Sequence, residues 1–518
     1  MTLQKAVNFY PDKVGVVDGT RSFTYAQTGE RTASLARFFL AQGIQPKDRI
    51  SIFEINSHAF LETYYAAAGI GAILNPLNFR LSPREVAFIL RDSGARWLVA
   101  GSQFADVVEG ILNEENPLEG ILWIGDAPPM SGNLQCDSFE NALNDNAGTF
   151  EPVPVNENDV AHLYYTSGTT GRPKGVMLTQ KNVCLHALGT IAELRLADTD
   201  IWGHIAPMFH LADAWATFAM TWVGARHVMV GQFEAEAVMA TIQKEQITLS
   251  NLIPTMLNLM IKHPNVAEYD FSSLRVILSG GAPIAPEVVR SITETFGCDY
   301  IQTYGMTETS PYLTFSLLKQ HLADLPAEAQ LKYKSKTGRP FIGVDLKVVD
   351  ENGNPVAADE QQVGEIWVRG DTITPGYWNL PDETQKAFHE GWLRTGDLAN
   401  LDVEGYVNIV DRKKDMIVTG GENVYSTEVE NVLYMNPKIL EAAVFAVPDE
   451  KWGEAVTAAV VLKENETATE KEIISFCKQH QASFKAPKSI LFIDELPKTG
   501  SGKIYKKALR DPYWEKDK

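Results

Sequence analysis

Residues 165–175 read YTSGTTGRPKG and directly follow an apolar segment, Val160–Tyr165. The eleven residues hold three glycines, five hydroxyl-bearing side chains and one lysine. Glycines let backbone N–H groups approach anionic oxygens, while hydroxyls and a lysine add hydrogen-bond donors and positive charge. The segment therefore predicts a loop that holds phosphate, and with it a nucleotide. The residues expected to bind are Thr166, Ser167, Gly168, Thr169, Thr170, Gly171 and Lys174.

This loop differs from the common phosphate-binding motif, which requires G-x-x-x-x-G-K-[ST]. Here Gly168 is followed by TTGRPKG, and Pro173 disfavours a helix that begins at the lysine. The alternative is a flexible connector rich in Ser, Thr and Gly. Such connectors are normally repetitive, and an Arg-Pro-Lys-Gly end is not typical of them.

The length and charge of the chain limit its architecture and its partners. A chain of 518 residues exceeds what one hydrophobic core usually organises, so at least two folding units are expected. With 45% hydrophobic and 22% charged residues, it has the composition of a soluble globular protein. A net charge of −20 argues against a general binder of nucleic acid or of anionic membranes, because these partners need a broad basic surface.

The cysteines and the apolar segments predict a cytoplasmic protein. The four cysteines form no C-x-x-C pair, so neither a disulfide framework nor a zinc site is expected. The N-terminus lacks a basic region followed by an apolar stretch. The longest apolar stretches, 66–74 and 214–225, are shorter than the roughly 20 residues that span a bilayer, so no integral membrane segment is expected.

The middle of the chain alternates short apolar runs with a helical pattern. Residues 275–281 and Asp299–Gly305 read as strands, and Pro286–Phe296 reads as a helix. Pro286 suits the first turn of this helix, and Gly297 can end it in a left-handed conformation. Strand, helix and strand in this order predict a parallel α/β sheet that binds its ligand at the carboxyl ends of the strands.

The pattern changes twice in the last third of the chain. After about residue 340 it predicts a smaller β subdomain, with strands at Val344–Val349 and 365–369 and a turn at 350–355. Beyond residues 411–415 it predicts a helix capped by Thr427 and Glu430, then a strand at 442–447. We place a domain boundary at Lys414.

Five further motifs stand beside the phosphate loop, in the order YGMTE at 304–308, TGD at 395–397, DR at 411–412, TGGEN at 419–423 and PKTGSGK at 497–503. Together they resemble the adenylate-forming superfamily of acyl-CoA synthetases, luciferases and nonribosomal-peptide adenylation domains. The resemblance runs from the first third of the chain to Lys503. It implies a large N-terminal domain of stacked α/β subdomains plus a β subdomain at 1–413, which binds AMP and the acyl group. A small mobile α+β domain at 414–518 would carry the catalytic lysine.

The resemblance implies that a carboxylate first reacts with ATP, which gives an acyl-adenylate and pyrophosphate. A carboxylate is a poor electrophile, and its attack on the α-phosphate builds charge that Mg²⁺, a lysine and oriented donors stabilise. Lys503 would be the catalytic cation, Glu308 would ligate Mg²⁺ and Thr307 would contact the α-phosphate. The resemblance also implies that the adenosine is held by Gly281, Ala282, Pro283, Tyr304, Gly305, Asp397 and Arg412.

In the second step of the superfamily the acyl group passes to a thiol after the C-terminal domain rotates. The equivalent of the family's hinge residue is Lys414, and rotation would exchange the Lys503 loop for the loop at 419–423. The stretch TGGENVYSTEVE resembles CoA ligases more than peptide-synthetase domains. The expected CoA contacts are Gly420, Gly421, Trp452, Lys485 and Lys488, of which the last three also have ordinary packing or surface interpretations.

The pocket for the acid is expected at His210, Leu211, Trp215, Gly280 and Met306. His210 is a candidate gate or catalytic neighbour of the carboxylate, or else a buried core histidine. The apolar walls favour a monocarboxylic acid with an apolar tail, and an inward-facing Trp215 would favour a short or medium chain. The segments HLADAWATF and TYGMTETSPYLTFSLL resemble short- and medium-chain acyl-CoA ligases, including those that activate 3-(methylthio)propionate.

Three alternatives stay open at this stage. The acid can be aromatic, of the benzoate or cinnamate type, and the enzyme can be a stand-alone adenylating enzyme that serves a carrier-protein thiol. A catalytically silent nucleotide-binding scaffold is disfavoured because Lys174, Glu308, Asp397 and Lys503 are all present. A homo-oligomer such as a dimer is compatible with the sequence, which does not determine the oligomeric state.

Overall fold

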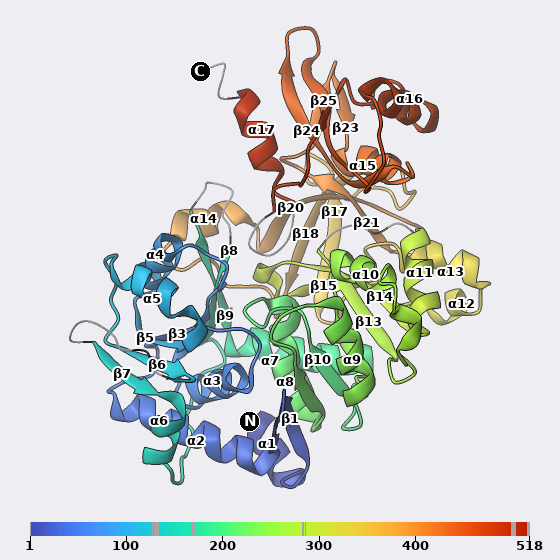
Figure 1. Ribbon diagram of the computed structural model, residues 1–518. Coiled ribbons are helices and arrows are strands. Elements are labelled where there is room, and N and C mark those ends of the chain that lie inside the picture. Colours follow the sequence, from blue (N-terminus) through green and yellow to red (C-terminus); the bar gives the residue numbers. More distant parts are fainter. Residues whose placement is uncertain are drawn as a thin grey trace.

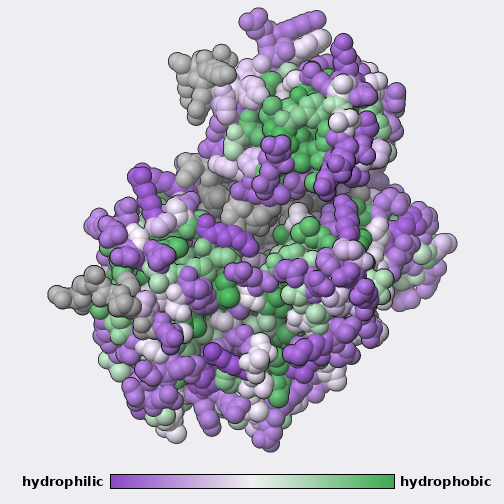
Figure 2. Space-filling model, in the orientation of Figure 1, coloured by the Kyte–Doolittle hydropathy of each residue, from purple (hydrophilic) through white to green (hydrophobic). Residues whose placement is uncertain are grey.

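The computed structural model describes residues 2–126, 128, 134–166, 172–281, 284, 286–498 and 504–514. A large part of the molecule contains the blue to yellow segments of the chain, and a smaller orange to red part lies above it (Figure 1). Hydrophilic residues cover much of the visible surface, in line with the high net charge (Figure 2). The predicted mixed α/β fold, with a large N-terminal part and a small C-terminal part, is confirmed.

Two largely parallel sheets organise the large part. The seven-stranded sheet has the order β7-β6-β5-β3-β4-β8-β9, and only its last pair, β8 and β9, is antiparallel. The nine-stranded sheet has the order β16-β15-β14-β13-β12-β10-β11-β1-β2. The strands are β1 Val14–Asp18, β2 Arg21–Thr24, β3 Arg49–Phe53, β4 Ile73–Pro76, β5 Ala95–Gly101, β6 Gly120–Ile124, β7 Gln135–Ser138, β8 Val160–Thr166, β9 Lys174–Thr179, β10 Ile201–His204, β11 Arg226–Met229, β12 Leu249–Asn251, β13 Val276–Gly280, β14 Asp299–Gly305, β15 Tyr312–Phe315 and β16 Arg339–Pro340.

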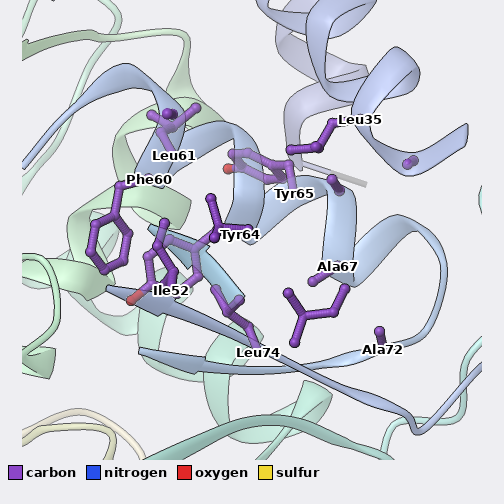
Figure 3. Close-up of a cluster of buried hydrophobic side chains, with 14 of the residues drawn as sticks. Leu35, Ile52, Phe60, Leu61, Tyr64, Tyr65, Ala67, Ala72 and Leu74 are labelled. Atoms are coloured by element: carbon purple, nitrogen blue, oxygen red, sulfur yellow. The ribbon is translucent and has the colours of Figure 1, made fainter. Parts of the chain in front are cut away.

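Helices fill the space around these sheets and build the core. Figure 3 shows Phe60 and Tyr64 of α3 on the side of Ile52 of β3 and Leu74 of β4, while Tyr65 of the same helix lies toward Leu35 of α2. The helices are α1 Thr2–Phe9, α2 Tyr25–Ala41, α3 His58–Gly69, α4 Pro83–Ser93, α5 Ala105–Leu112, α6 Phe139–Asp145, α7 Gln180–Leu194, α8 Leu211–Val223, α9 Ala235–Glu245, α10 Pro254–Ile261, α11 Pro286–Phe296, α12 Gln320–Ala323, α13 Ala327–Lys334 and α14 Pro381–Ala387, with short 3₁₀ turns η1 Ser102–Phe104, η2 Val266–Glu268 and η3 Thr307–Thr309.

A five-stranded antiparallel sheet forms the predicted β subdomain. Its path is β17-β18-β20-β19, and β21 pairs with β20. The strands are β17 Val344–Val349, β18 Gly364–Gly370, β19 Phe388–His389, β20 Trp392–Leu401 and β21 Val407–Arg412.

The C-terminal part contains another five-stranded sheet, with the path β23-β22-β25-β24 and β26 paired with β25. Buried side chains of α15 and α16 pack on one face of this sheet. The elements are β22 Ile417–Thr419, β23 Glu422–Val424, α15 Ser426–Tyr434, β24 Ile439–Asp449, β25 Gly453–Leu462, α16 Glu470–His480, β26 Ser489–Phe492 and α17 Lys506–Trp514. The division into domains at Lys414 stays a prediction.

Several local predictions can be compared with these elements. The helix Pro286–Phe296 is confirmed as α11, and Gly297 follows it with a φ of 63°. The strand Val344–Val349 coincides with β17. The strand expected at 442–447 is longer, since β24 covers Ile439–Asp449.

The predicted capping of the next helix by Thr427 and Glu430 is wrong. α15 begins at Ser426, so Thr427 lies inside the helix, where its hydroxyl donates to the Val410 carbonyl. The carboxylate of Asp411 takes the place of the expected cap and accepts the Ser426 N–H at 2.5 Å and its hydroxyl at 2.9 Å. A carboxylate from outside the helix thus accepts a backbone N–H at the start of α15. A search for capping pairs within the local sequence does not find such a partner.

Candidate active site

Lys174, the lysine of the predicted phosphate loop, lies at the start of β9, against the segment between β18 and α14. The Trp378 N–H donates to the Gly175 carbonyl at 2.7 Å, and the Met177 N–H donates to the Gly376 carbonyl at 3.1 Å. Tyr377 is therefore held beside β9. The side chain of Tyr377 lies between two residues that the sequence singles out, Lys174 and Glu308.

Tyr377 connects these two residues directly. Its hydroxyl donates to Oε1 of Glu308 at 2.8 Å, and Nζ of Lys174 lies 5.3 Å from the centroid of its ring. Glu308 stands on η3, directly after β14, and is only 7% exposed. Burial raises the pKa of the Glu308 carboxyl, and the hydrogen bond from Tyr377 opposes that rise. The site thus holds a poorly hydrated carboxylate oriented by a phenol.

Lys174 also has a counter-ion that the sequence analysis missed. Its Nζ lies 2.6 Å from Oε2 of Glu383, which belongs to the first turn of α14. The hydrogen bonds from Lys174 and Lys386 lower the pKa of Glu383 to about 2, so this residue is a carboxylate at neutral pH. Neither Tyr377 nor Glu383 belongs to a motif used above; the run GYWNLPDET at 376–384, with its proline at the start of α14, is the local signal that was available.

The predicted ribose-binding residues come together on neighbouring strands. Asp397 of β20 and Arg412 of β21 are register partners, and the Arg412 Nε lies 3.3 Å from Oδ1 of Asp397. The other carboxylate oxygen accepts the hydroxyl of Tyr304 at 2.7 Å. Burial and the Asp397 charge raise the pKa of Tyr304 well above its usual value, so the phenol stays a donor.

Two glycines of the predicted nucleotide site have specific backbone roles. Gly305 ends β14, and a Cβ at this position would lie 1.9 Å from the Pro311 carbonyl oxygen. Gly281 follows β13 with a φ of 88°, which favours glycine. Since β13 and β14 are parallel neighbours, both glycines lie at the carboxyl edge of the sheet, as expected.

Part of the predicted nucleotide site falls outside the described residues. Thr166 is the last residue of β8 and is the register partner of Lys174. Thr307 is partly exposed on η3, beside Glu308. The residues of the prediction that lie outside the described ranges are Ser167, Gly168, Thr169, Thr170, Gly171, Ala282, Pro283 and Lys503.

Two of the five predicted acyl-pocket residues line a common cavity. Leu211 and Trp215 of α8 border a cavity of about 10 Å³. The indole N–H of Trp215 donates to the Ala212 carbonyl at 3.1 Å and to the Tyr312 hydroxyl at 2.9 Å, so the ring has a fixed position.

The other three predicted residues stand elsewhere around the carboxyl edge. His210 precedes α8 as its N-cap residue, Gly280 ends β13, and Met306 stands between β14 and η3. None of them lines this cavity in the part of the chain that the structure describes.

The predicted CoA loop forms a tight hairpin. Gly420 and Gly421 connect β22 to β23 with φ values of 61° and 85°, and both values favour glycine. The Gly420 N–H donates to the Trp452 carbonyl at 2.8 Å, and the indole packs on this glycine while 43% of Trp452 stays exposed. The hairpin and Trp452 therefore form one exposed surface.

The two lysines of the CoA prediction are not joined to this surface by the described contacts. Lys485 pairs with Glu428 of α15 at 2.6 Å. Lys488 is exposed, and its backbone N–H donates to the Val456 carbonyl at 2.7 Å.

The predicted hinge residue follows β21 and lines a cavity of about 350 Å³ together with Arg510 and Trp514 of α17. Burial lowers the pKa of the Lys414 amine. Beside the hinge, Lys506 of α17 donates to the Ser426 hydroxyl at 2.6 Å and pairs with Glu430 at 2.7 Å. The Ser426 hydroxyl in turn donates to Asp411, so a chain of polar contacts joins residues on the two sides of the predicted hinge.

Comparison with known proteins decides the family of this chain. A model of the AMP-binding enzyme family matches residues 3–378, and a model of the AMP-binding enzyme C-terminal domain matches residues 428–503. The chain belongs to the AMP-binding enzymes. The predicted membership of the adenylate-forming superfamily, and of its AMP-forming acyl-CoA synthetases, is confirmed.

Relatives of this AMP-binding enzyme cover nearly its whole length. A feruloyl-CoA synthase of Amycolatopsis sp is 35% identical over 96% of this chain and 96% of its own. A 4-hydroxybutyrate–CoA ligase of Metallosphaera sedula is 33% identical over 98% of this chain and 93% of its own. A 3-methylmercaptopropionyl-CoA ligase of Ruegeria lacuscaerulensis is 33% identical over 96% of this chain and 93% of its own.

Solved structures show the same fold. An anthranilate CoA ligase in complex with anthranoyl-AMP is similar with a TM-score of 0.89 and 27% identity, over 99% of this chain and 96% of its own. An O-succinylbenzoate coenzyme A synthetase from Bacillus subtilis in complex with ATP and magnesium ion has a TM-score of 0.83 and 27% identity, over 99% of both chains. Among the described residues of the present enzyme, no helix combines the length and the apolar character needed to cross a membrane.

Proposed function

We propose that this AMP-binding enzyme joins a monocarboxylic acid to CoA in two steps, through an acyl-adenylate. The observation that carries the proposal is the convergence of Lys174, Tyr377 and Glu308, which sets a cation and a buried carboxylate on either side of one phenol. A cation and a metal-binding carboxylate are the groups that a polyphosphate needs.

In the first step, Lys174 and the hydroxyl-rich loop bind the β- and γ-phosphates, and Asp397 accepts hydrogen bonds from the ribose hydroxyls. Glu308 would hold Mg²⁺, which would offset the charge of the phosphates, and Thr307 would contact the α-phosphate. Among the described residues no three His, Cys, Asp or Glu side chains are grouped to hold a metal ion. This fits Mg²⁺, which is commonly bound by one or two carboxylates together with phosphate and water oxygens. Lys503 neutralises the charge that develops between carboxylate and α-phosphate.

In the second step, residues 414–518 rotate as a domain about Lys414, and CoA meets the Gly420–Gly421 hairpin and Trp452. The exposed indole beside a hairpin with two left-handed glycines supports this role, because an aromatic ring can stack on adenine while the hairpin lets pantetheine approach the backbone. Lys485 and Lys488 are the proposed phosphate contacts. Lys485 would have to exchange Glu428 for a phosphate.

The proposed acid has a short or medium chain. Trp215 is held by Tyr312, and the small cavity beside it leaves little space beyond the ring. Relatives named for a thioether acid and for 4-hydroxybutyrate support short acids, whereas the feruloyl-CoA synthase keeps an aryl acid as the second candidate.

We also propose that the enzyme is cytoplasmic and is either a monomer or a dimer. Four free cysteines support a reducing compartment.

The proposal is tested by measuring the release of pyrophosphate and of AMP. The acids are linear C2 to C12, thioether and aromatic acids, each with and without CoA. We expect AMP release that depends on the acid, Mg²⁺ and CoA. A carrier-protein enzyme would also release pyrophosphate, but added CoA would yield neither thioester nor additional AMP. Lys503→Ala should lose most adenylation and still form thioester from supplied acyl-adenylate. Absence of AMP with every acid would refute the proposal.

A further inference from the structure

The small cavity beside Trp215 contains polar groups that an alkyl chain does not use. Its apolar wall consists of Leu178, Val183, Leu211, Trp215 and Phe218. The remaining lining residues are His162, His186 and Ser310. A pocket built only for a hydrocarbon tail has no use for these groups, since buried polar atoms need hydrogen-bond partners.

Two of these three polar residues are satisfied by the protein. Nε2 of His186 accepts the backbone N–H of Tyr312 at 3.2 Å. The hydroxyl of Ser310 donates to the carbonyl of Thr372 at 2.7 Å. Both therefore have structural partners and need no ligand.

His162 is different. It is 2% exposed, and its Nδ1 has no hydrogen-bond partner among the residues that the structure describes. Its ring is wedged between aromatic neighbours, with centroids 5.3 Å from Tyr64 and 5.4 Å from Phe218. An unpartnered buried imidazole nitrogen costs free energy, and a ligand that supplies the missing hydrogen bond recovers it.

Two residues that line the cavity are close in sequence to residues with proposed roles in the reaction. Leu211 directly follows His210 at the start of α8, and Ser310 lies two residues after Glu308, the proposed metal ligand. The cavity is thus lined by residues of the two segments that carry His210 and Glu308. Its volume of about 10 Å³ is at the lower limit for one water, so it suits a small terminal group and not a long chain.

We propose that His162 hydrogen-bonds a neutral terminal hydroxyl of the acid, which makes the enzyme a ligase for a short hydroxy acid. The inference rests on the proposed acid–CoA ligase function. A hydroxyl both donates and accepts, so it can pair with either neutral tautomer of the ring.

The charge state of His162 excludes a second carboxylate on the substrate. Burial lowers the pKa of His162 to about 3, so the ring is neutral at physiological pH. Among the residues that the structure describes, no Lys or Arg lines the cavity. A carboxylate placed in this cavity would lose its hydration without gaining a counter-ion, which is far more costly than burying a hydroxyl.

Matched pairs of acids test the proposal, because a terminal hydroxyl and a terminal methyl have nearly the same size. The pairs are 3-hydroxypropionate with butyrate, 4-hydroxybutyrate with pentanoate, and 4-coumarate with 4-methylcinnamate. We expect the wild type to prefer the hydroxyl member of at least one pair by about tenfold in kcat/KM for AMP formation, because the methyl partner leaves the imidazole unpaired. His162→Phe should lower this ratio to about one while it still turns over the methyl acid, which shows that the variant is folded.

Tyr164→Phe is the matched control. Tyr164 stands on the same strand as His162 and is also buried, but it does not line the cavity. The substitution removes a hydroxyl that is hydrogen-bonded to Tyr64. This variant should keep the hydroxyl preference. The comparison of paired acids on the wild-type enzyme tests the inference without any variant. If the enzyme has ligase activity but prefers the hydroxyl acid in no pair, this inference is wrong and the proposed function stands. Absence of AMP with all acids overturns the proposed function as well.

Discussion

The amine of Lys174 and the carboxylate of Glu383 lie 2.6 Å apart, although 209 residues separate them in the chain. The lysine of the predicted phosphate loop therefore forms an ion pair with a carboxylate of α14. If a polyphosphate binds Lys174 as proposed, it must compete with this carboxylate, so we expect the ion pair to weaken nucleotide binding.

Glu383→Gln should tighten the binding of ATP. The amide keeps the size of the side chain but removes the competing charge, and water and salt screen an exposed ion pair, so the effect should be modest. We expect the KM for ATP to fall roughly two- to fivefold with little change in kcat, measured as AMP formation at saturating acid and CoA. Lys386→Gln is the control, because Lys386 contacts the other oxygen of Glu383 and not Lys174. A rise in the KM for ATP in Glu383→Gln would show instead that Glu383 assists nucleotide binding.

Tyr377→Phe should weaken the response to Mg²⁺. The ring stays beside Lys174, but Glu308 loses the hydrogen bond that orients it and stabilises its charge. The Mg²⁺ concentration for half-maximal activity should rise roughly tenfold, as is typical when a partner of a metal ligand is removed. At saturating Mg²⁺ the KM for ATP should be unchanged. An unchanged Mg²⁺ requirement would show that Tyr377 has no role in metal binding.

The same substitution should shift the pH profile in a defined direction. The hydrogen bond from Tyr377 lowers the pKa of Glu308, so its loss raises that pKa further. Less of the Glu308 carboxyl is then ionised at a given acidic pH, and the acid limb of kcat/KM should move to higher pH. A shift to lower pH in Tyr377→Phe would contradict this assignment.

The residues that sequence alone predicted are those within contiguous motifs. Asp397 and Arg412 were expected at one sugar, and the pairing of β20 with β21 brings them together. Tyr377 and Glu383 were missed because their roles depend on contacts with Lys174 and Glu308 across the fold, which no local pattern records. The predicted cap of α15 was wrong for the same reason, since Asp411 of β21 accepts the Ser426 N–H from outside the helix. His162 was missed because a polar residue in an apolar strand does not reveal whether its partner is protein or ligand.

Gly421→Leu should separate the two half-reactions. A side chain at a φ of 85° strains the hairpin and blocks the proposed path of pantetheine, although the surroundings of the position are open. We expect normal pyrophosphate release from acid and ATP, and at least a tenfold loss of thioester formation, or about 1.4 kcal/mol. The matched control is Gly353→Leu, because Gly353 also has a left-handed φ of 83° and open surroundings but lies in the turn after β17. Equal thioester output from both variants would argue against the assigned CoA loop.

A buried histidine near the N-terminus should give the stability a pH dependence. Nδ1 of His58 lies 2.7 Å from Asp18, and Nε2 lies 3.8 Å from Glu140, while only 4% of the side chain is exposed. Burial opposes protonation, but these carboxylates and Glu62 outweigh it and raise the pKa of His58 to about 9. Because the folded pKa exceeds the unfolded value of 6.5, the stabilisation is fully present below pH 6.5 and is lost as the pH rises through 9.

His58→Gln should therefore lower the apparent Tm most at pH 6 and progressively less toward pH 9.5. The pH-dependent part of the difference in unfolding free energy between the two proteins should be roughly 1–3 kcal/mol. The pKa shift of His58 is large, but Glu140 is half exposed, so solvent screens its charge. Burial raises the pKa of Glu54 to about 7 and also raises that of Glu62, and the charge of His58 opposes both shifts. The difference in Tm therefore reports His58 together with its effect on these two carboxyls. His389→Gln, at an exposed histidine, is the control and should show no such trend. A Tm difference between wild type and His58→Gln that stays constant from pH 6 to 9.5 would mean that His58 contributes packing and no charge.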